Sequence, residues 1–232
     1  MITFTSLASG SSGNLYTVSD GDTTVMLECG LPWRKVRELL NFKTSEIGGI
    51  VLTHSHLDHC KGAKDAARAG MDIYASRETL DALDISAHRR HEISESVEFP
   101  IGTWLVVPFA TVHDVEGSLG FYMGSQGERF LYLTDSAYSP VKFKDLSVIA
   151  VECNFVEDKL SENIQAGVIP KVVGRRTRRT HFSLETLIEF LKANDLRRCR
   201  KIYLLHLSDG NSDERRMVRE VQEATGIPTE AC

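Results

Sequence analysis

The chain has 232 residues, of which 42% are hydrophobic and 25% are charged, and these values are ordinary for a globular domain. Its net charge of −5 excludes a general electrostatic attraction to nucleic acid, although a local basic surface is compatible with it. The sequence has no run of about 18 apolar residues, so we expect no membrane-spanning helix and no membrane partner. The first residues lack the features of a secretory signal, and the five cysteines are scattered without a CxxC pair, so we expect reduced thiols in the cytoplasm.

The first half of the chain combines short apolar strands with helical segments. Apolar, β-type runs predict strands at residues 2–8, 15–19, 23–29, 47–53 and 71–75. Apolar residues at helical spacing predict helices over 33–42 and 60–69, and Gly70 is expected to end the second of them. Ser76 is expected to cap a further short helix, and the polar residues 88–95 are expected at the surface.

The second half begins with further strands and ends with helices around one more strand. The predicted strands are residues 104–112, 117–123, 130–134, 148–152 and 201–205. Residues 170–180, which are dense in arginine, are expected to form a loop. An amphipathic helix is expected over 183–193 with Ser183 as its cap, and Ser212 or Asp213 is expected to cap a last helix ending at Thr225. This order favours two sheets between helices over a simple alternating parallel sheet.

The segment His54-Ser55-His56-Leu57-Asp58-His59 carries four side chains of the metal-binding type directly after an apolar strand. In a strand, positions 54 and 56 point the same way, and a turn after them would bring Asp58 and His59 to the same centre. Imidazole nitrogens with a carboxylate oxygen suit Zn²⁺, with Mn²⁺ and Fe²⁺ as alternatives. The segment therefore predicts a metal site.

Four further candidates follow apolar runs or the arginine-rich segment, and they are His113, Asp135, His181 and His206. A single histidine at a strand end is more often a surface residue or a hydrogen-bonded residue than a ligand. Together with the four metal-type side chains at positions 54–59, however, these residues are numerous enough to hold two metal ions. Functional groups at strand ends are held in place by a rigid scaffold, as an active site requires. His88 and His91, in a polar stretch, are interpreted as surface residues.

At these residues the sequence resembles the metallo-β-lactamase superfamily, whose five motifs all have counterparts here. The HxHxDH signature is residues 54–59, and the third, fourth and fifth motifs are matched by His113, Asp135 and His206. Glu28 stands where the first motif normally has an aspartate. In the family that residue supports the HxHxDH loop through hydrogen bonds and binds no metal.

The resemblance extends from residue 1 to about residue 210 and implies an α/β fold. The implied architecture is an αββα four-layer sandwich, in which two mixed β-sheets are flanked by helices, as a single domain over residues 1–232. The implied ligands form three groups, with His54, His56 and His113 on one metal, Asp58, His59 and His206 on the other, and Asp135 bridging the two.

Within the superfamily, the sequence is most similar to the bacterial walk-operon-type DNA exonuclease and phosphodiesterase branch. The matching motifs are the LASGSxGN opening, the pair His113-Asp114, the segment Glu152-Cys153-Asn154, an added histidine motif at His181 and the segment His206-Leu207-Ser208. The sequence departs from that branch at Phe155 and Val156, where histidine and aspartate are usual, and at Phe182, which replaces a leucine.

Two segments are candidate substrate contacts. Small residues around Ser11, Ser12 and Asn14 would let backbone N–H groups approach an anion, although an ordinary tight turn explains this loop equally well. The basic stretch that ends beside His181 holds Lys171, Arg175, Arg176, Arg178 and Arg179. Arginine forks suit phosphate oxygens, whereas a solvated loop is the alternative, and few aromatic residues are present to stack on bases.

These features favour an enzyme, a dinuclear metal-dependent phosphodiesterase that acts as a nuclease on DNA or RNA through a hydroxide bridging the metals. Asp58 would orient the nucleophile, and His181 would hydrogen-bond the phosphoryl oxygen or protonate the leaving alkoxide. The first alternative is hydrolysis of a small cyclic phosphate or cyclic nucleotide. The second is hydrolysis of a lactone or thioester, and a non-catalytic metal-binding module ranks last. The sequence leaves open whether a homodimer lends loops to the site.

Overall fold

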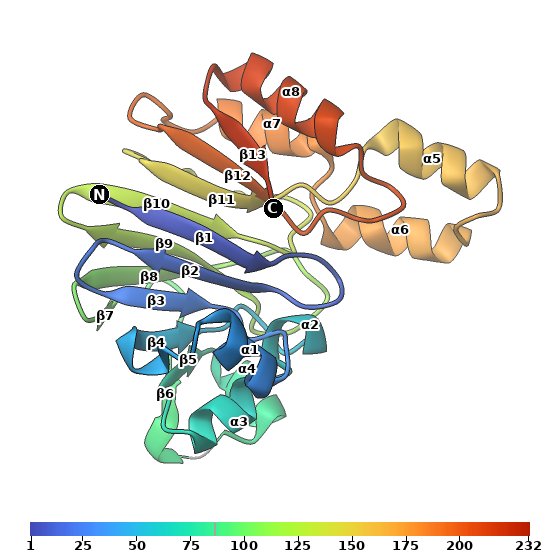
Figure 1. Ribbon diagram of the computed structural model, residues 1–232. Helices are drawn as coiled ribbons and strands as arrows, with labels where there is room; N and C mark the ends of the chain where they lie inside the picture. Colours follow the sequence, from blue (N-terminus) through green and yellow to red (C-terminus); the bar gives the residue numbers. More distant parts are fainter. Residues whose placement is uncertain (86) are drawn as a thin grey trace. The chain divides into compact units, whose positions relative to one another are not determined.

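The computed structural model describes residues 1–85 and 87–232. The chain divides into two compact units, whose helices and strands are labelled in Figure 1. The first unit comprises Met1–Ala110 and Val115–Glu128, and the second comprises Thr111–Asp114 and Arg129–Cys232. Each unit carries some of the residues that the sequence marks as functional.

The first unit contains a six-stranded mixed sheet in the order β1-β2-β3-β4-β5-β6. Its strands are β1 (Thr3–Ala8), β2 (Leu15–Ser19), β3 (Thr24–Leu27), β4 (Ile47–Val51), β5 (Ile73–Ala75) and β6 (Arg90–Glu92). β1, β2 and β3 pair antiparallel, and β3 to β6 pair parallel. All five strands predicted in this part of the sequence are confirmed with small shifts of their ends. β6 lies within the polar stretch that was expected only to be surface.

Short helices pack on this sheet and bury its apolar residues. They are α1 (Trp33–Leu39), α2 (Leu57–Cys60), α3 (Ala63–Arg68) and α4 (Arg77–Leu83), with single turns η1 (Thr44–Glu46) and η2 (Ala87–Arg89). Val36, Ala66 and Leu80 from three of these helices join Ile50 and Ile73 of the sheet in one buried cluster. Ser76 caps α4 as expected, because its hydroxyl accepts a hydrogen bond from the backbone N–H of Thr79 at 3.3 Å.

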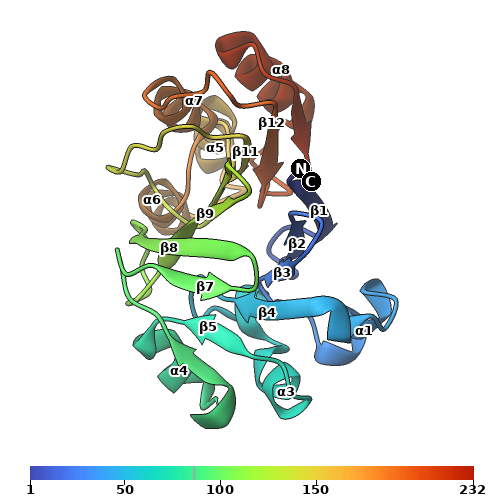
Figure 2. The same cartoon turned by 90° about the vertical axis from the view of Figure 1, so that its left-hand side faces the viewer.

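The first unit also holds three antiparallel strands, β7 (Phe99–Ile101), β8 (Trp104–Ala110) and β9 (Leu119–Ser125). Figure 2 shows β7 and β8 side by side, and their register pairs Ile101 with Trp104 across the turn. On β8 the buried residues Trp104 and Val106 alternate with the exposed Leu105, which is the pattern of a strand with one buried face.

The second unit is built on four strands in the order β10-β11-β12-β13, and the strand pairs with a described register are parallel. They are β10 (Glu128–Leu133), β11 (Val148–Glu152), β12 (Lys201–Leu205) and β13 (Thr229–Ala231). Every residue of β11 is buried, as is typical of a parallel strand with both faces covered. The helices are α5 (Glu157–Gln165), α6 (Lys171–Thr180), α7 (Leu184–Lys192) and α8 (Glu214–Thr225).

The predicted caps of the last two long helices are confirmed. Ser183 accepts a hydrogen bond from the N–H of Thr186 at 3.1 Å and begins α7. Of the two candidates for α8, Asp213 is the cap, because its carboxylate accepts the N–H of Arg216 at 3.0 Å.

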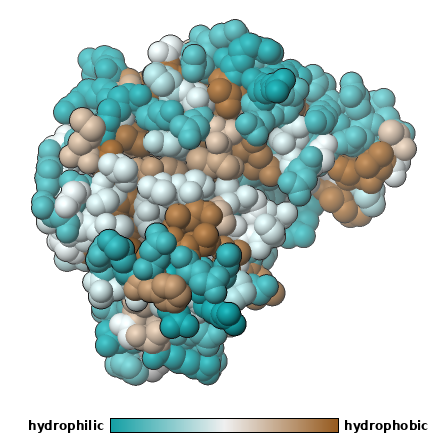
Figure 3. All heavy atoms as spheres, viewed as in Figure 1, coloured by the Kyte–Doolittle hydropathy of each residue, from teal (hydrophilic) through white to brown (hydrophobic). Residues whose placement is uncertain are grey.

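The prediction of a loop over residues 170–180 is wrong, because this stretch forms α6. Arginine and lysine are good helix formers, but only Gly174 and Thr180 of α6 are buried, so the apolar spacing that identifies a helix is missing. Gly174 lets α6 approach α5, since a Cβ there would lie 2.3 Å from Cδ1 of Ile164. Figure 3 shows a hydrophobic area at the outer end of these two helices, where Val168 and Val172 are exposed.

Among the described residues, no helix has the length and apolarity needed to cross a membrane. All five cysteines are free thiols, and Cys29, Cys60 and Cys153 are buried.

Candidate metal centre

The histidine segment, residues 54–59, follows β4 in the first unit. After β4 ends at Val51, the chain stays buried through Leu52 and Thr53 and then turns into α2, with His56 at the N-cap position. His54 and His59 are each 1% exposed. The buried strand therefore delivers two imidazoles into the interior at its carboxyl end.

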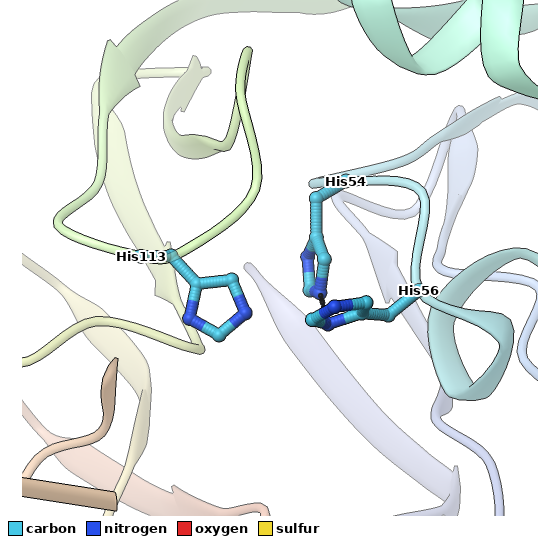
Figure 4. A group of neighbouring side chains, drawn as sticks. All are labelled: His54, His56 and His113. Atoms are coloured by element: carbon cyan, nitrogen blue, oxygen red, sulfur yellow. Dashed lines mark hydrogen bonds between the residues drawn. The ribbon is translucent and has the colours of Figure 1, made fainter. Parts of the chain in front are cut away.

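His54 and His56 already face one another. Nε2 of His54 lies 3.0 Å from Nδ1 of His56 (Figure 4). Two nitrogens bound to one tetrahedral Zn²⁺ at about 2.05 Å would be about 3.3 Å apart, so this pair fits a shared ion after a small shift. Nδ1 of His54 lies 2.9 Å from the hydroxyl of Thr53, which orients the ring.

Glu28, which directly follows β3, supports the histidine segment. It is fully buried and accepts hydrogen bonds from the hydroxyl of Thr53 at 2.6 Å and from its N–H at 3.3 Å. Its Oε1 also lies 3.2 Å from Nδ1 of His59. Glu28 has a positive φ of 67°, which is uncommon for a residue other than glycine. The glutamate therefore makes the supporting contacts that the family's aspartate makes.

Asn14 lies inside the first unit. It is fully buried, and its Nδ2 lies 3.2 Å from Nε2 of His59 and 3.5 Å from Oδ2 of Asp58. Its Oδ1 accepts the hydroxyl of Tyr16 at 2.9 Å. These contacts make Asn14 a positioning residue for the histidine segment. Ser11 and Ser12 of the same loop are exposed.

Gly30 is where three segments of backbone meet. Its N–H donates to the carbonyl of Asn14 at 2.9 Å, and the N–H of Asn14 donates to the carbonyl of Asp58 at 2.7 Å. A Cβ on Gly30 would lie 1.8 Å from that same carbonyl oxygen. Only glycine fits here, because any side chain would displace the backbone that carries Asp58.

In the second unit, polar side chains follow the ends of β10, β11 and β12. Asp135 follows β10, Glu152 ends β11 and His206 follows β12, while His181 follows α6. Each of these four residues offers one ligand atom, and the four atoms lie within 4.8 Å of one another. We call these four residues the carboxylate–histidine cluster. It brings together the predicted site residues Asp135, His181 and His206 and adds Glu152. Carboxylates and imidazoles are suitable ligands for Zn²⁺, Mn²⁺ or Fe²⁺.

Glu152 organises the cluster, a role that its motif Glu152-Cys153-Asn154 did not indicate. It is fully buried; Oε1 lies 2.6 Å from Nδ1 of His181 and 3.1 Å from Nδ1 of His206, and Oε2 accepts the N–H groups of Ser136 and Phe182, both at 3.2 Å. The available signal was a carboxylate that ends a strand of otherwise apolar residues. Such a carboxylate is buried with the strand and needs partners.

The electrostatics of the cluster favour a charged His181. Burial alone would lower the pKa of His181, but the carboxylates of Glu152 and Asp135 outweigh it and raise that pKa to about 10. Burial alone would raise the pKa of Glu152, but the neighbouring His181 holds it below its usual value. Oδ1 of Asp135 lies 3.1 Å from Nδ1 of His181.

His113 and the start of its loop belong to the second unit. Its side chain is 1% exposed, and its Nδ1 lies 3.1 Å from the carbonyl of Thr180 at the end of α6. Its ring centroid lies 5.7 Å from that of His181. Burial lowers the pKa of His113, which favours the neutral imidazole that a metal ligand requires.

The candidate arginines lie on α6, and two of them are paired with carboxylates. Arg176 donates to Asp114 at 2.7 Å, and Arg178 donates to Glu157 through two nitrogens at 2.5 and 3.0 Å. Arg175 and Arg179 are exposed.

The family description "Beta-lactamase superfamily domain" matches residues 23–207, which is more than half of the chain. The chain belongs to this superfamily. It is 27% identical over 221 residues to exodeoxyribonuclease WalJ of Streptococcus pneumoniae, and the alignment covers 89% of this chain and 81% of WalJ. The superfamily and its WalJ-like branch are those that the sequence motifs resemble.

Solved structures show the same fold. The metallo-β-lactamase fold protein YhfI of Bacillus subtilis matches with a TM-score of 0.76 at 14% identity, covering 100% of this chain and 96% of YhfI. Zn²⁺-bound PqqB of Methylobacterium extorquens matches with a TM-score of 0.73 at 16% identity, covering 100% of this chain and 97% of PqqB. The predicted architecture of two mixed β-sheets flanked by helices is thereby confirmed, and the protein is a metal-dependent hydrolase of this superfamily.

Proposed function

We propose that the protein is a dinuclear metal-dependent phosphodiesterase, and specifically a nuclease that acts on DNA or RNA. The observation that carries this proposal is the cationic helix α6, which ends directly at His181 and its carboxylate–histidine cluster. A strongly basic helix is of use for a polyanionic substrate and has no evident role in hydrolysis of a lactone or thioester. The name of the relative, exodeoxyribonuclease WalJ, supports the same substrate class.

The proposed metal ligands are those implied by the sequence motifs. They are His54, His56 and His113 for one ion, Asp58, His59 and His206 for the other, and Asp135 between them. Zinc is favoured because imidazoles dominate the donor set and because PqqB, a solved structure of the same fold, is Zn²⁺-bound. Two such ions would supply water activated near neutral pH and would offset charge on the phosphoryl oxygens.

The chain's own residues have defined tasks in this proposal. Asp58 would orient the attacking water. The Nδ1 of His181 is held by Glu152, so Nε2 is the atom that would donate to the phosphoryl oxygen or to the leaving alkoxide. General-acid help of this kind contributes about 10²–10⁴-fold to rate. The proposal includes a cytoplasmic location, which follows from the cysteine pattern of the sequence.

The test is the substitution His56→Ala, with hydrolysis of linear DNA, RNA and cyclic mononucleotides measured in Zn²⁺ and in Mn²⁺. We expect turnover of nucleic acid by the wild type, and loss of that turnover in His56→Ala with an unchanged circular dichroism spectrum. His88→Ala, at an exposed histidine, is the matched control and should retain activity. Full activity of His56→Ala would refute the assignment. Cleavage of cyclic mononucleotides but not of DNA or RNA would favour the small-substrate alternative.

A further inference from the structure

The five cations of α6 lie on one side of the helix. At about 100° per residue, Arg178, Lys171, Arg175, Arg179 and Arg176 follow one another around an arc of about 160°. α6 contains no acidic residue, and its buried residues, Gly174 and Thr180, lie outside this arc. The arc is a concentrated positive surface in a chain whose net charge is −5.

The cations at the two edges of the arc are neutralised within the second unit. Arg178 binds Glu157 and also donates to the hydroxyl of Ser161 at 2.9 Å, which ties α6 to α5. Arg176 binds Asp114 in the loop that carries His113. These two arginines therefore fix the orientation of α6 rather than offering free charge.

The cations in the middle of the arc are Lys171, Arg175 and Arg179. All three are exposed, and none has a hydrogen-bond or ion-pair partner among residues 1–85 and 87–232. Their spacing of four residues aligns them in a row with steps of about 6 Å and a length of about 12 Å. Arg179 is two positions before His181, so the row ends beside the carboxylate–histidine cluster.

We propose that Lys171, Arg175 and Arg179, the cationic row, bind successive phosphates of a single nucleic-acid strand and lead it toward His181. This inference rests on the proposed nuclease function and deepens it, because it selects a polynucleotide over a cyclic mononucleotide. A row of about 12 Å exceeds what one phosphate can occupy, and α6 has no aromatic residue to stack on a base. Binding is therefore to the backbone and independent of base sequence.

The test measures binding without turnover. A fluorescently labelled 12-nucleotide single-stranded DNA with phosphorothioate linkages, which resist hydrolysis, is titrated with the Zn²⁺-loaded protein at 50 and 200 mM salt. The same titration is made with one triple variant that combines Lys171→Gln, Arg175→Gln and Arg179→Gln. We expect affinity at 50 mM salt to fall by on the order of tenfold, and the slope of log K against log salt to become shallower by about 2, since each lost phosphate contributes about 0.7.

Helix α1 offers a matched control. Arg34→Gln, Lys35→Gln, Arg37→Gln also removes one lysine and two arginines from an exposed helix, and it should bind as the wild type does. A charge-retaining variant, Arg175→Lys with Arg179→Lys, should keep the wild-type salt slope. Wild-type affinity and slope in the triple glutamine variant of α6, or an equal loss in the α1 variant, would overturn the inference.

The two proposals fail in different ways. If the wild type binds DNA through the cationic row but cleaves no phosphodiester, the proposed nuclease function is wrong and the strand-binding row stands. If the wild type cleaves DNA while the α6 variant binds it normally, the function stands and the row is wrong.

Discussion

Glu152 shows how one buried carboxylate can hold several functional groups in place. Its two oxygens contact the rings of His181 and His206 and two backbone N–H groups, and none of it is exposed. A buried charge is tolerated only when all of its hydrogen-bonding capacity is used, as it is here. The carboxylate consequently sets which ring nitrogen of each histidine is available to a ligand.

Replacing Glu152 by glutamine tests this role. Glutamine keeps the size of the side chain but turns an NH₂ group toward groups that themselves donate hydrogen bonds. We therefore expect the free energy of unfolding to fall by about 1–3 kcal/mol. We also expect Zn²⁺ affinity to fall about 10–100-fold, because Glu152 holds the ring of His206. Chemical denaturation and metal titration measure the two effects. Glu162→Gln, at an exposed site on α5, is the control, and equal behaviour of the two variants would contradict the role.

Asp20 gives a prediction about pH. Burial alone would raise the pKa of Asp20, but hydrogen bonds from Ser125, from Thr103 at 2.5 Å and from two backbone N–H groups hold that pKa well below its usual value. A lowered pKa means that the carboxylate stabilises the fold above the ordinary carboxyl pKa of about 4, and that this contribution is lost as pH falls toward the lower native pKa.

We therefore expect Asp20→Asn to lower the free energy of unfolding by about 1–3 kcal/mol at pH 7. The difference from the wild type should shrink as the pH is lowered from 5 to 3. Denaturant unfolding at several pH values measures it, and Asp22→Asn, at an exposed neighbour, is the control. A difference that stays constant or grows on acidification would show that the carboxylate charge is not responsible.

At the scale of elements, most strands were predictable because their apolar runs are short and bounded by turn residues, whereas the three-residue strands β6, β7 and β13 were missed. β11 and β12 match the sequence prediction residue for residue. The helix α6 was not predictable from periodicity, because its contact with α5 uses Gly174 in place of an apolar side chain. Helix α5 was also missed, since its mean character is polar and only Leu160 is buried.

The histidine segment could be identified from the sequence as a set of candidate ligands, whereas the residues that support it were only partly predictable. Motif resemblance assigned Glu28 a supporting role, and the structure gives the contacts that perform it. Asn14 was expected to contact substrate, but it lies buried against Asp58 and His59. The contact between Asn14 and Asp58 joins loops that are 44 residues apart in sequence, so no local sequence pattern could predict it.

Gly30 provides a prediction at this scale, because it lets the loop after β3 pack against the histidine segment. In Gly30→Ala the added Cβ would overlap the carbonyl of Asp58, so we expect a loss of about 1–3 kcal/mol in stability together with weakened metal binding. Thermal denaturation and zinc titration report both. Gly210→Ala is the control, since a Cβ there meets nothing within 4 Å. Wild-type metal affinity in Gly30→Ala would contradict the close contact.

For the whole molecule, the fold class could be predicted because the order of strands and helices and the motif spacing agree. The expectation of a single domain over residues 1–232 stays a prediction, and the structure has two compact units.

Removing metal should affect the whole chain. Ligands that bind only the folded state stabilise it by about 3–4 kcal/mol at 100–1,000 times Kd, which for a chain of this length is about 5–15 °C in Tm. We expect a chelator to lower Tm by this amount and to abolish hydrolysis, and Zn²⁺ or Mn²⁺ to restore both. Scanning calorimetry measures Tm, elemental analysis measures the metal content, and an activity assay measures hydrolysis. An unchanged Tm after complete metal loss would contradict the prediction.

The histidine segment also has a consequence for how the proposed metal ions would be acquired. Its four proposed ligands lie within six residues, whereas Asp135 and His206 are 71 positions apart, so the entropic cost of closing the loop between the second pair is larger by about 2 kcal/mol. A growing or unfolded chain can therefore hold an ion on the segment before its second unit exists. Binding to the segment alone is also open to the unfolded chain and adds little to folding stability, so thermal protection by the proposed ions would come mainly from their bonds to the distant His113, Asp135 and His206.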